Sequence, residues 1–124
     1  MGNYTDGFVF PIRHDHLPEY KQVAVQVAEI WKEHGALAYC EYVGDDLALE
    51  GTRSFPEMVE ANEGEAIVFG WVVFDSRETR NLANEKVAAD PRMAELVAPL
   101  TDSRKIFDAG RMAYGGFKAL TISQ

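Results

Sequence analysis

The sequence of 124 residues predicts a single α+β domain, spanning residues 1–124, in which strands and helices follow each other as βαββαβ. Three observations support this fold class. The longest apolar run, residues 66–74 (AIVFGWVVF), is rich in β-branched and aromatic residues and predicts a buried strand. Residues 17–31 repeat apolar side chains at spacings of three and four, which indicates an amphipathic helix. The segments 4–12 and 111–122 alternate as strands do.

The first strand and the first helix can be read from residues 4–35. Residues 4–12 alternate aromatic and β-branched side chains; Pro11 indicates that the strand ends or meets a sheet edge there, and Asp6 interrupts the apolar face. Asp15 is the expected N-cap of the helix, and Gly35 is its natural stop. We therefore expect a strand followed directly by a helix.

The middle of the chain predicts two more strands joined by a long connection. Residues 36–43 read as the second strand, with Glu41 on the same face as Leu37, Tyr39 and Val43. Residues 45–64 are polar and broken by glycine, with one short helix expected after Ser54 as its cap. The apolar run 66–74 is the third strand.

The second half of the βαββαβ order follows the third strand. Ser76 is the expected cap of a helix that ends at Asp90-Pro91, where a further short helix can begin. Residues 99–108, which include Arg104 and Lys105, are expected to form a loop, and the glycine pair within 111–122 indicates a bulge, a bend or close packing. The side chains of the second helix expected to point inward are Leu82, Ala83, Val87 and Ala88.

Two split βαβ units make an antiparallel four-stranded sheet with both helices on one face, the ferredoxin-like plan. The third strand, however, carries apolar residues on both of its faces, and the helices can cover only one of them. An uncovered apolar sheet face is an interaction surface, so we expect a second copy to cover it and form a homodimer by sheet-on-sheet contact.

Composition excludes several classes of partner. The net charge of −8 and the lack of any run of Lys or Arg make nucleic acid and anionic membrane surfaces poor partners. The single cysteine, Cys40, cannot form an intrachain disulfide and fits a reducing compartment. No apolar run approaches membrane-spanning length, and none follows a basic N-terminal region, so a cytoplasmic protein is expected.

Several segments together carry a resemblance to a known family. They are residues 6–9 (DGFV), 31–37 (WKEHGAL), 43–46 (VGDD), 54–56 (SFP), 89–93 (ADPRM) and 110–118 (GRMAYGGFK). In these stretches the sequence resembles the bacterial domain-of-unknown-function family 1428. The resemblance implies the dimeric α+β-barrel fold and no established activity. Some members of that superfamily hold small ligands between sheet and helices, and some are cofactor-independent monooxygenases or haem-degrading enzymes.

The resemblance suggests candidate site residues, each of which also has a purely structural interpretation. A tryptophan on the third strand can shape the pocket in that superfamily, and Trp71 is placed like one, although aromatic residues on central strands usually pack in the core. His34 could be a general base, or it could interact with the helix dipole at the end of the first helix. The candidate ligand-binding residues are Trp71, Tyr39, Tyr114, Arg111 and Asn81, with His34 as the candidate catalytic residue.

Cofactor and metal sites have weaker support. No histidine falls in the second helix, where haem-degrading relatives hold their ligand, so no cofactor is expected. The fragment His14-Asp15-His16 lacks a third ligand spaced nearby, and Asp15 already has a capping role, so no metal is expected. Arg77 and Arg80 could bind a carboxylate together, but solvated surface charge is the preferred explanation.

Two hypotheses of different classes remain. In the first, a cytoplasmic homodimer binds a small, largely apolar or aromatic molecule between sheet and helices, and any enzyme activity would resemble that of a cofactor-independent monooxygenase or an isomerase. In the second, the chain is a non-catalytic dimerisation or interaction module whose aromatic residues are simply core. A cavity filled by Phe69, Trp71 and Leu82 would favour the second.

Overall fold

The computed structural model describes residues 2–102 and 106–123, and it contains one antiparallel sheet of four strands. The strand order across the sheet is β2-β3-β1-β4. This is the order of the ferredoxin-like plan, so the predicted fold class is confirmed. The strands are β1 (Tyr4–Arg13), β2 (Ala38–Val43), β3 (Glu65–Phe74) and β4 (Ala113–Lys118).

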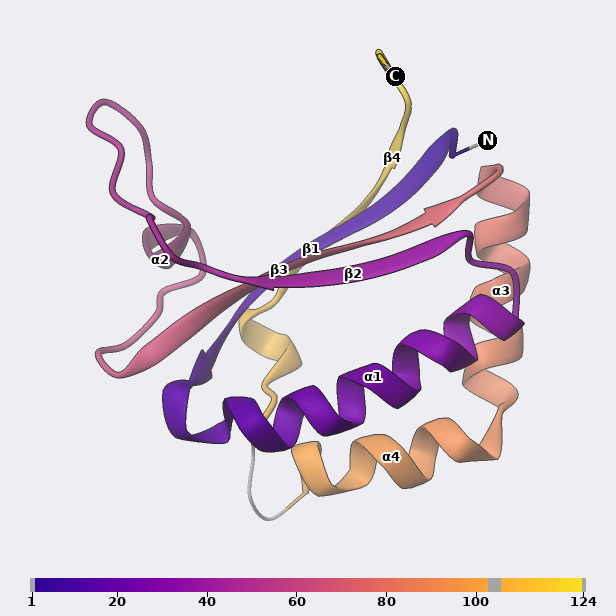
Figure 1. The fold of residues 1–124 in the computed structure, drawn as a ribbon, viewed down its shortest axis with the longest axis horizontal. Helices are drawn as coiled ribbons and strands as arrows, with labels where there is room; N and C mark the ends of the chain where they lie inside the picture. Colours follow the sequence, from indigo (N-terminus) through magenta and orange to yellow (C-terminus); the bar gives the residue numbers. More distant parts are fainter. Residues whose placement is uncertain (1, 103–105, 124) are drawn as a thin grey trace.

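Three helices lie on one side of the sheet (Figure 1). They are α1 (Leu17–Glu33), α3 (Arg77–Ala89) and α4 (Pro91–Thr101). A one-turn helix, α2 (Phe55–Met58), lies in the long connection between β2 and β3 and begins at Ser54, which forms a capping box with Glu57 as its sequence indicates. The helices cover only one face of the sheet, which leaves the other face to this connection.

The two central strands carry the longest pairing in the sheet. Tyr4 to Arg13 of β1 lie opposite Phe74 to Glu65 of β3. Of the two outcomes predicted at Pro11, β1 meets a sheet edge there and does not end, because β4 pairs with β1 only as far as Val9. The edge of β1 beside Pro11 therefore has no ladder partner from β4, and a residue without an N–H is tolerated there.

The core lies between the helices and the face of β1 and β3 that carries the even-numbered residues. Phe10 and Phe74 are almost completely buried, and Trp31 of α1 meets Phe74 edge to face with ring centroids 6.2 Å apart. The members of this core that come from the sheet are Phe8, Phe10, Ile12, Ala66, Val68, Val72 and Phe74. Burial of large apolar side chains at about 25 cal/mol per Å² makes this layer the main source of stability.

The first helix begins differently from its prediction. A 3-10 turn, η1 (His14–His16), precedes α1, and Asp15 caps neither element. Its carboxylate instead pairs with the guanidinium of Arg13, with 3.2 Å between Nε and Oδ1. The C-terminus agrees with the sequence: Gly35 has φ +125°, a conformation that favours glycine.

The second half of the chain departs from its prediction in three places. Ala83 and Val87 are buried as expected, whereas Leu82 and Ala88 face solvent, because α3 turns only a narrow face to the sheet. Helix α4 runs through Pro99 to Thr101, so the expected loop is shorter, and Arg104 and Lys105 lie outside the described residues. The last strand covers Ala113–Lys118 only, and a 3-10 turn, η2 (Ala109–Arg111), precedes it.

The glycine pair of the last strand is explained by close packing. Gly115 and Gly116 continue the ladder opposite Gly7 and Asp6 with no bulge. A Cβ atom at Gly116 would overlap the hydroxyl of Tyr4. Of the three explanations the sequence left open, close approach is the one observed.

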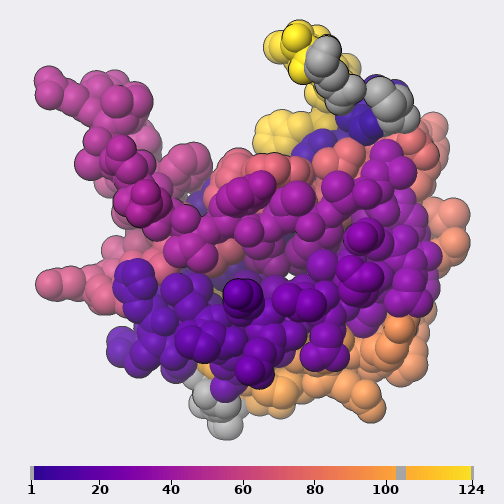
Figure 2. Space-filling view, in the orientation of Figure 1, coloured from indigo at the N-terminus to yellow at the C-terminus, as the bar shows by residue number. Residues whose placement is uncertain are grey.

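The second sheet face is only partly covered. Val59 and Leu47 of the β2–β3 connection pack with Val9 and Ile67, while the outer part of that connection, near residues 48–53, stands away from the body as an arm (Figure 2). Phe69 and Phe117 remain 40% and 63% exposed on this face. Among the described residues, no helix has the length and apolar character needed to cross a membrane.

Candidate functional site

The register of the sheet brings two carboxyl groups to the helix-facing side. Glu41 of β2 lies opposite Gly70, and Asp6 of β1 lies opposite Val72. Both residues interrupt apolar faces in the sequence, and the period of two then directs them towards the core. Each sits in its own cluster of tyrosine side chains.

An open groove lies between α1 and the edge strand β2. Its volume is about 710 Å³, which is within the range of small-molecule sites. The walls are mainly apolar, and the polar groups of Tyr20, Tyr39 and Glu41 gather among them. The complete lining is Leu17, Pro18, Tyr20, Lys21, Ala24, Val25, Ala28, Tyr39, Glu41, Tyr42, Val43 and Val68.

Glu41 is the acidic residue that lines this groove. The hydroxyl of Tyr20 donates a short hydrogen bond to Oε1 of Glu41. Burial raises the pKa of Glu41 above that of an exposed glutamate, and the neighbouring phenols of Tyr20 and Tyr39 counteract only part of that shift. The carboxyl therefore holds its proton to a higher pH than a surface glutamate and is better matched to proton transfer near neutrality.

The two phenols beside Glu41 are held in their neutral form. Burial raises the pKa of Tyr20 and of Tyr39 far above that of a free tyrosine, and the Glu41 carboxylate adds to both shifts. A phenol that keeps its proton can donate a hydrogen bond throughout the physiological pH range. The groove thus combines one proton acceptor with two fixed donors.

A second polar cluster lies further along the same sheet face. Asp6 is 1% exposed, and its Oδ2 accepts a hydrogen bond of 2.5 Å from the hydroxyl of Tyr114. Arg80 of α3 places NH1 3.4 Å from Oδ1 of Asp6 and donates from NH2 to the hydroxyl of Tyr4 at 2.9 Å. The guanidinium also lies over the Tyr4 ring, 5.1 Å from its centroid. These contacts join β1, α3 and β4.

His34 lies at the C-terminal end of α1 and contacts the start of α4. Its Nε2 is 2.9 Å from Oδ2 of Asp90, whose carboxylate also binds Arg92 at 2.7 Å. The hydrogen bonds from Arg92 and His34 lower the pKa of Asp90. His34 is not among the residues that line the groove, and its contacts join two helices.

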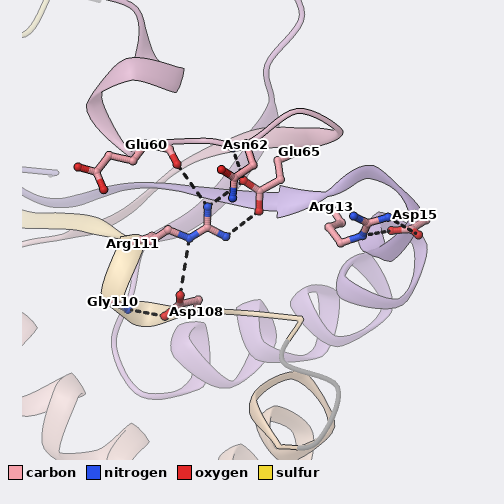
Figure 3. Close-up of polar contacts among 8 residues, drawn as sticks. All are labelled: Arg13, Asp15, Glu60, Asn62, Glu65, Asp108, Gly110 and Arg111. Carbon is pink, nitrogen blue, oxygen red and sulfur yellow. Dashed lines mark hydrogen bonds and ion pairs between the residues drawn. The ribbon is translucent and has the colours of Figure 1, made fainter.

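Arg111 holds the end of the β2–β3 connection against the beginning of β4 (Figure 3). Its NH1 and NH2 donate to the two carboxylate oxygens of Glu65 at 2.8 and 2.6 Å, a bidentate pair. NH1 also reaches the carbonyl oxygen of Glu60 at 3.5 Å, and Nε lies 3.6 Å from Oδ2 of Asp108. The Arg111 guanidinium and its partners Glu60, Glu65 and Asp108 form a clamp, and Arg111 is not among the residues that line the groove.

The remaining predicted site residues lie apart from each other. Trp71 is on the face that points away from the helices, where its ring stacks on Tyr42 at 5.0 Å and meets Phe69 edge to face at 5.5 Å. Asn81 is exposed on α3. Of the six residues predicted from the sequence, Tyr39 lines the groove and Tyr114 belongs to the second cluster. Phe69, Trp71 and Leu82, whose filling of a cavity would have favoured the interaction module, do not meet in one, because Phe69 and Trp71 lie on the outer face and Leu82 on the exposed side of α3.

Sequence reasoning missed the residues that give the groove its chemistry. Glu41 and Asp6 were noticed only as polar interruptions of apolar strand faces, and Tyr20 only as part of the apolar stripe of α1. The useful signal was the interruption itself, since an acidic residue on a buried strand face must find donors. No grouping of three or more His, Cys, Asp or Glu suited to a metal ion occurs within residues 2–102 and 106–123.

The fold and the groove show that this is an α+β protein of the ferredoxin-like plan with a cleft between one helix and the edge of its sheet. A family model described as "Protein of unknown function (DUF1428)" matches residues 3–108. The chain therefore belongs to the DUF1428 family. A relative from Escherichia coli K12, the uncharacterized protein YbaA, is 37% identical over 117 residues, covering 94% of this chain and 96% of its own.

Solved structures share the fold at low sequence identity. A NIPSNAP family protein of unknown function from Agrobacterium tumefaciens superposes with a TM-score of 0.59 at 15% identity, over 98% of this chain and 91% of its own. A candidate antibiotic biosynthesis monooxygenase from Nitrosomonas europaea gives a TM-score of 0.58 at 9% identity, over 96% and 91%. These likenesses establish the architecture and leave the chemistry to the residues of this chain.

Proposed function

We propose that the chain binds a small molecule with a largely apolar body and one polar group, in the groove between α1 and β2. The observation that carries this proposal is the half-buried carboxyl of Glu41, set among apolar walls with the phenols of Tyr20 and Tyr39 beside it. A polar group of this kind inside an apolar cleft fixes the orientation of a ligand, while the walls supply most of its affinity.

The role of the groove in ligand binding can be tested by filling it with a large side chain. Ala24 of α1 lines the groove, so Ala24→Trp should place an indole where the ligand body would lie. The matched control is Ala94→Trp on the exposed side of α4. We expect naphthols, indoles and aryl ketones to shift the amide NMR signals of α1 and β2, with affinity at least tenfold weaker in Ala24→Trp and unchanged in Ala94→Trp. Equal binding by wild type and Ala24→Trp would refute the groove as the site.

We further propose that the outer sheet face is the contact surface of a homodimer. Support comes from the exposed aromatic rings of Tyr42, Phe69 and Phe117 around Trp71, on a face that the β2–β3 connection covers only in part. Contiguous exposed apolar surface of this kind favours association. A second copy placed face to face would bury these rings in both chains.

The dimer is tested by introducing charge into this face. Phe117→Glu should give a monomer in light scattering at low micromolar concentration, whereas the wild type should show about twice the 13.9 kDa mass of one chain. Leu82→Glu provides a control, because Leu82 is half exposed on α3, away from that face. A wild-type protein that stays monomeric at these concentrations would contradict the homodimer and, with it, the interaction-module hypothesis.

A further inference from the structure

The segment that follows β4 carries apolar side chains but has no partner strand of its own. Residues 119–122 leave the sheet and run on beyond it, away from the helices (Figure 1). Leu120 is 97% exposed and Ile122 is 52% exposed, and Thr121 lies between them. Apolar residues at alternate positions are typical of a half-buried strand. In a single chain this segment therefore leaves in water the apolar surface that a strand partner would bury.

The backbone of this segment has free hydrogen-bonding groups on its even-numbered residues. The N–H of Ala119 donates to the carbonyl oxygen of Asn3 at 2.9 Å, so the odd-numbered residues of this strand turn their N–H and C=O groups towards β1. In an extended chain Lys118, Leu120 and Ile122 turn theirs the other way. No strand lies on that side among the described residues, because β4 is at the edge of the sheet.

The opposite edge of the sheet, β2, has the complementary pattern. The N–H of Gly44, just after β2, donates to the carbonyl oxygen of Ile67 at 2.8 Å, so the even-numbered residues of β2 pair with β3. Tyr39, Glu41 and Val43 then turn their backbone N–H and C=O groups outward, and all three line the groove. An edge strand with this row of groups is a template for an added strand.

The groove has an open side in a single chain. Val25 of α1 and Val43 of β2 line it, yet they are 59% and 51% exposed. Sites for small molecules usually bury most of the surface of their ligand. A strand added to β2 would close this open side, because its alternate side chains would project towards α1 beside Val25.

An antiparallel pairing joins the two free edges in a defined register. The pairs in this register are Lys118 with Val43, Leu120 with Glu41, and Ile122 with Tyr39. Each pair joins residues whose backbone groups point out of their own sheet, so the hydrogen bonds alternate as in a regular ladder. The side chains of Leu120 and Ile122 then lie on the same side of the strand, which is the side of the groove.

Length and charge fit this pairing. Residues 118–122 span roughly 17 Å at about 3.4 Å per residue, and the groove follows α1 from Leu17 to Ala28, roughly 16 Å at about 1.5 Å per residue. Lys118 would lie beside Asp45 and Asp46, which are exposed immediately after β2. The parallel direction would place Lys118 at the other end of β2, so charge favours the antiparallel one.

We propose that residues 118–122 of a second copy add to β2 as an antiparallel strand, and that Leu120 and Ile122 of that copy form the outer wall of the groove. This inference rests on the proposed function, because it completes the ligand groove and names a contact of the homodimer. In a two-fold dimer the exchange is mutual, so both grooves are closed. Ligand binding and dimerisation then strengthen each other.

Cross-linking tests the register. In a Cys40→Ser background, Val43→Cys with Lys118→Cys places two thiols on facing residues whose Cα atoms would be about 5.5 Å apart, within reach of a disulfide. One chain cannot make this bond, because β2 and β4 are at opposite edges of its sheet. Mild oxidation should give a covalent dimer on a non-reducing gel. The control, Val43→Cys with Leu82→Cys on α3, should remain a single chain.

Substitutions after β4 test the shared groove. Leu120 is almost fully exposed in one chain, so Leu120→Asp should leave the fold intact, which circular dichroism checks. We expect its Kd for 2-naphthol, measured by NMR titration, to be at least tenfold weaker, and Leu82→Asp to match the wild type. Leu120→Pro removes an N–H that points towards β2 and should weaken binding similarly. Thr121→Pro removes one that points away and should not.

The outcomes separate this inference from the proposed function. A wild type that is dimeric in light scattering but gives no cross-link through Val43→Cys and Lys118→Cys would overturn the strand exchange and leave the homodimer intact. A wild-type Kd in Leu120→Asp would overturn the shared wall and leave ligand binding intact. A monomeric wild type would overturn both the homodimer and this inference. If no compound of the panel binds the wild type, the ligand site fails, and a cross-link would still confirm the strand pairing.

Discussion

The clamp between Arg111 and Glu65 allows a sharp test of whether Arg111 is structural. Replacing the arginine by methionine keeps most of the side-chain volume and removes two hydrogen bonds of 2.8 and 2.6 Å to a carboxylate that is only 7% exposed. The change leaves Glu65 with the backbone N–H of Asn62 as its remaining close donor. Stability should fall because a mostly buried carboxylate loses its charged partner.

The size of the loss can be worked out from the pKa of Glu65. Its pKa is lowered from 4.5 to about 2, chiefly by the hydrogen bonds from Arg111. At about 1.4 kcal/mol per pKa unit this shift corresponds to an upper limit of about 3.5 kcal/mol. Because Arg111 is partly exposed and the pair lies near solvent, screening reduces the expected loss for Arg111→Met to about 1–2 kcal/mol.

The assay is urea unfolding of the wild type and Arg111→Met as a function of pH. The folded pKa of Glu65 lies below the unfolded value, so its contribution is complete above about pH 4.5 and is lost as the pH falls towards 2. The difference between the two proteins should therefore be largest at pH 7 and less than half as large at pH 3. A double-mutant cycle with Glu65→Gln should assign most of it to the pair.

Two results would refute this reasoning. A stability difference that is the same at pH 7 and pH 3 would show that the loss comes from packing and not from the charge pair. If Arg111→Met has wild-type stability but binds groove ligands more weakly, Arg111 is a ligand-binding residue, as predicted from the sequence, and not a structural one.

Three further predictions concern the sheet. Gly70→Ala should lower the free energy of unfolding by about 1–3 kcal/mol, measured by urea denaturation, because its Cβ would overlap the Phe8 ring and approach a backbone carbonyl; unchanged stability would contradict this packing. Asp6→Ala should lower the free energy of unfolding by about 3–5 kcal/mol in the same assay, because it leaves the mostly buried Arg80 without its carboxylate partner. A loss below about 1 kcal/mol would show that the Asp6–Arg80 pair does not stabilise the fold. Glu41→Gln should be more stable than the wild type at pH 8 but not at pH 4, because a raised pKa makes the folded state lose stability as pH rises; thermal melts at the two pH values test the sign.

Much of the fold could be predicted because its signals are local. The apolar run that became β3 carries side chains for two faces, and the spacing of α1 and the glycine after it fix where that helix ends. The capping sites at Ser54 and Ser76 were also readable, because a side-chain oxygen three residues before an N–H is a property of the local sequence.

The errors have physical reasons that lie outside the local sequence. Asp15 would be positioned to cap a helix that began directly after it, but it lies inside the 3-10 turn that precedes α1, and its carboxylate pairs with Arg13 at the end of β1. At Pro11 the sequence left open whether the strand ends or meets an edge, and the edge is observed because β4 stops before reaching it. Pro99 is tolerated in the last turns of α4, where the sequence indicated that the helix had already ended.

The candidate site was harder to predict than the fold, because it depends on which residues meet across the sheet. Tyr39 was chosen for its phenol, but its partner Glu41 gains importance only when α1 places Tyr20 against it, 21 residues away in the chain. Trp71 could not be assigned from its sequence, since neighbouring positions on a strand point to opposite faces. The register of β3 decides that it faces away from the helices.

The position of β1 in the sheet has a consequence for how the chain folds. The first strand to leave the ribosome must wait for β3, about 60 residues later, and for β4, which contains the last residues of the sheet. Pairings so distant in sequence give a high contact order, which slows folding relative to helical bundles of similar size. During synthesis the apolar and acidic residues of β1 remain without their full set of sheet partners until β4 has emerged, so this domain is most exposed to aggregation just before β4 docks.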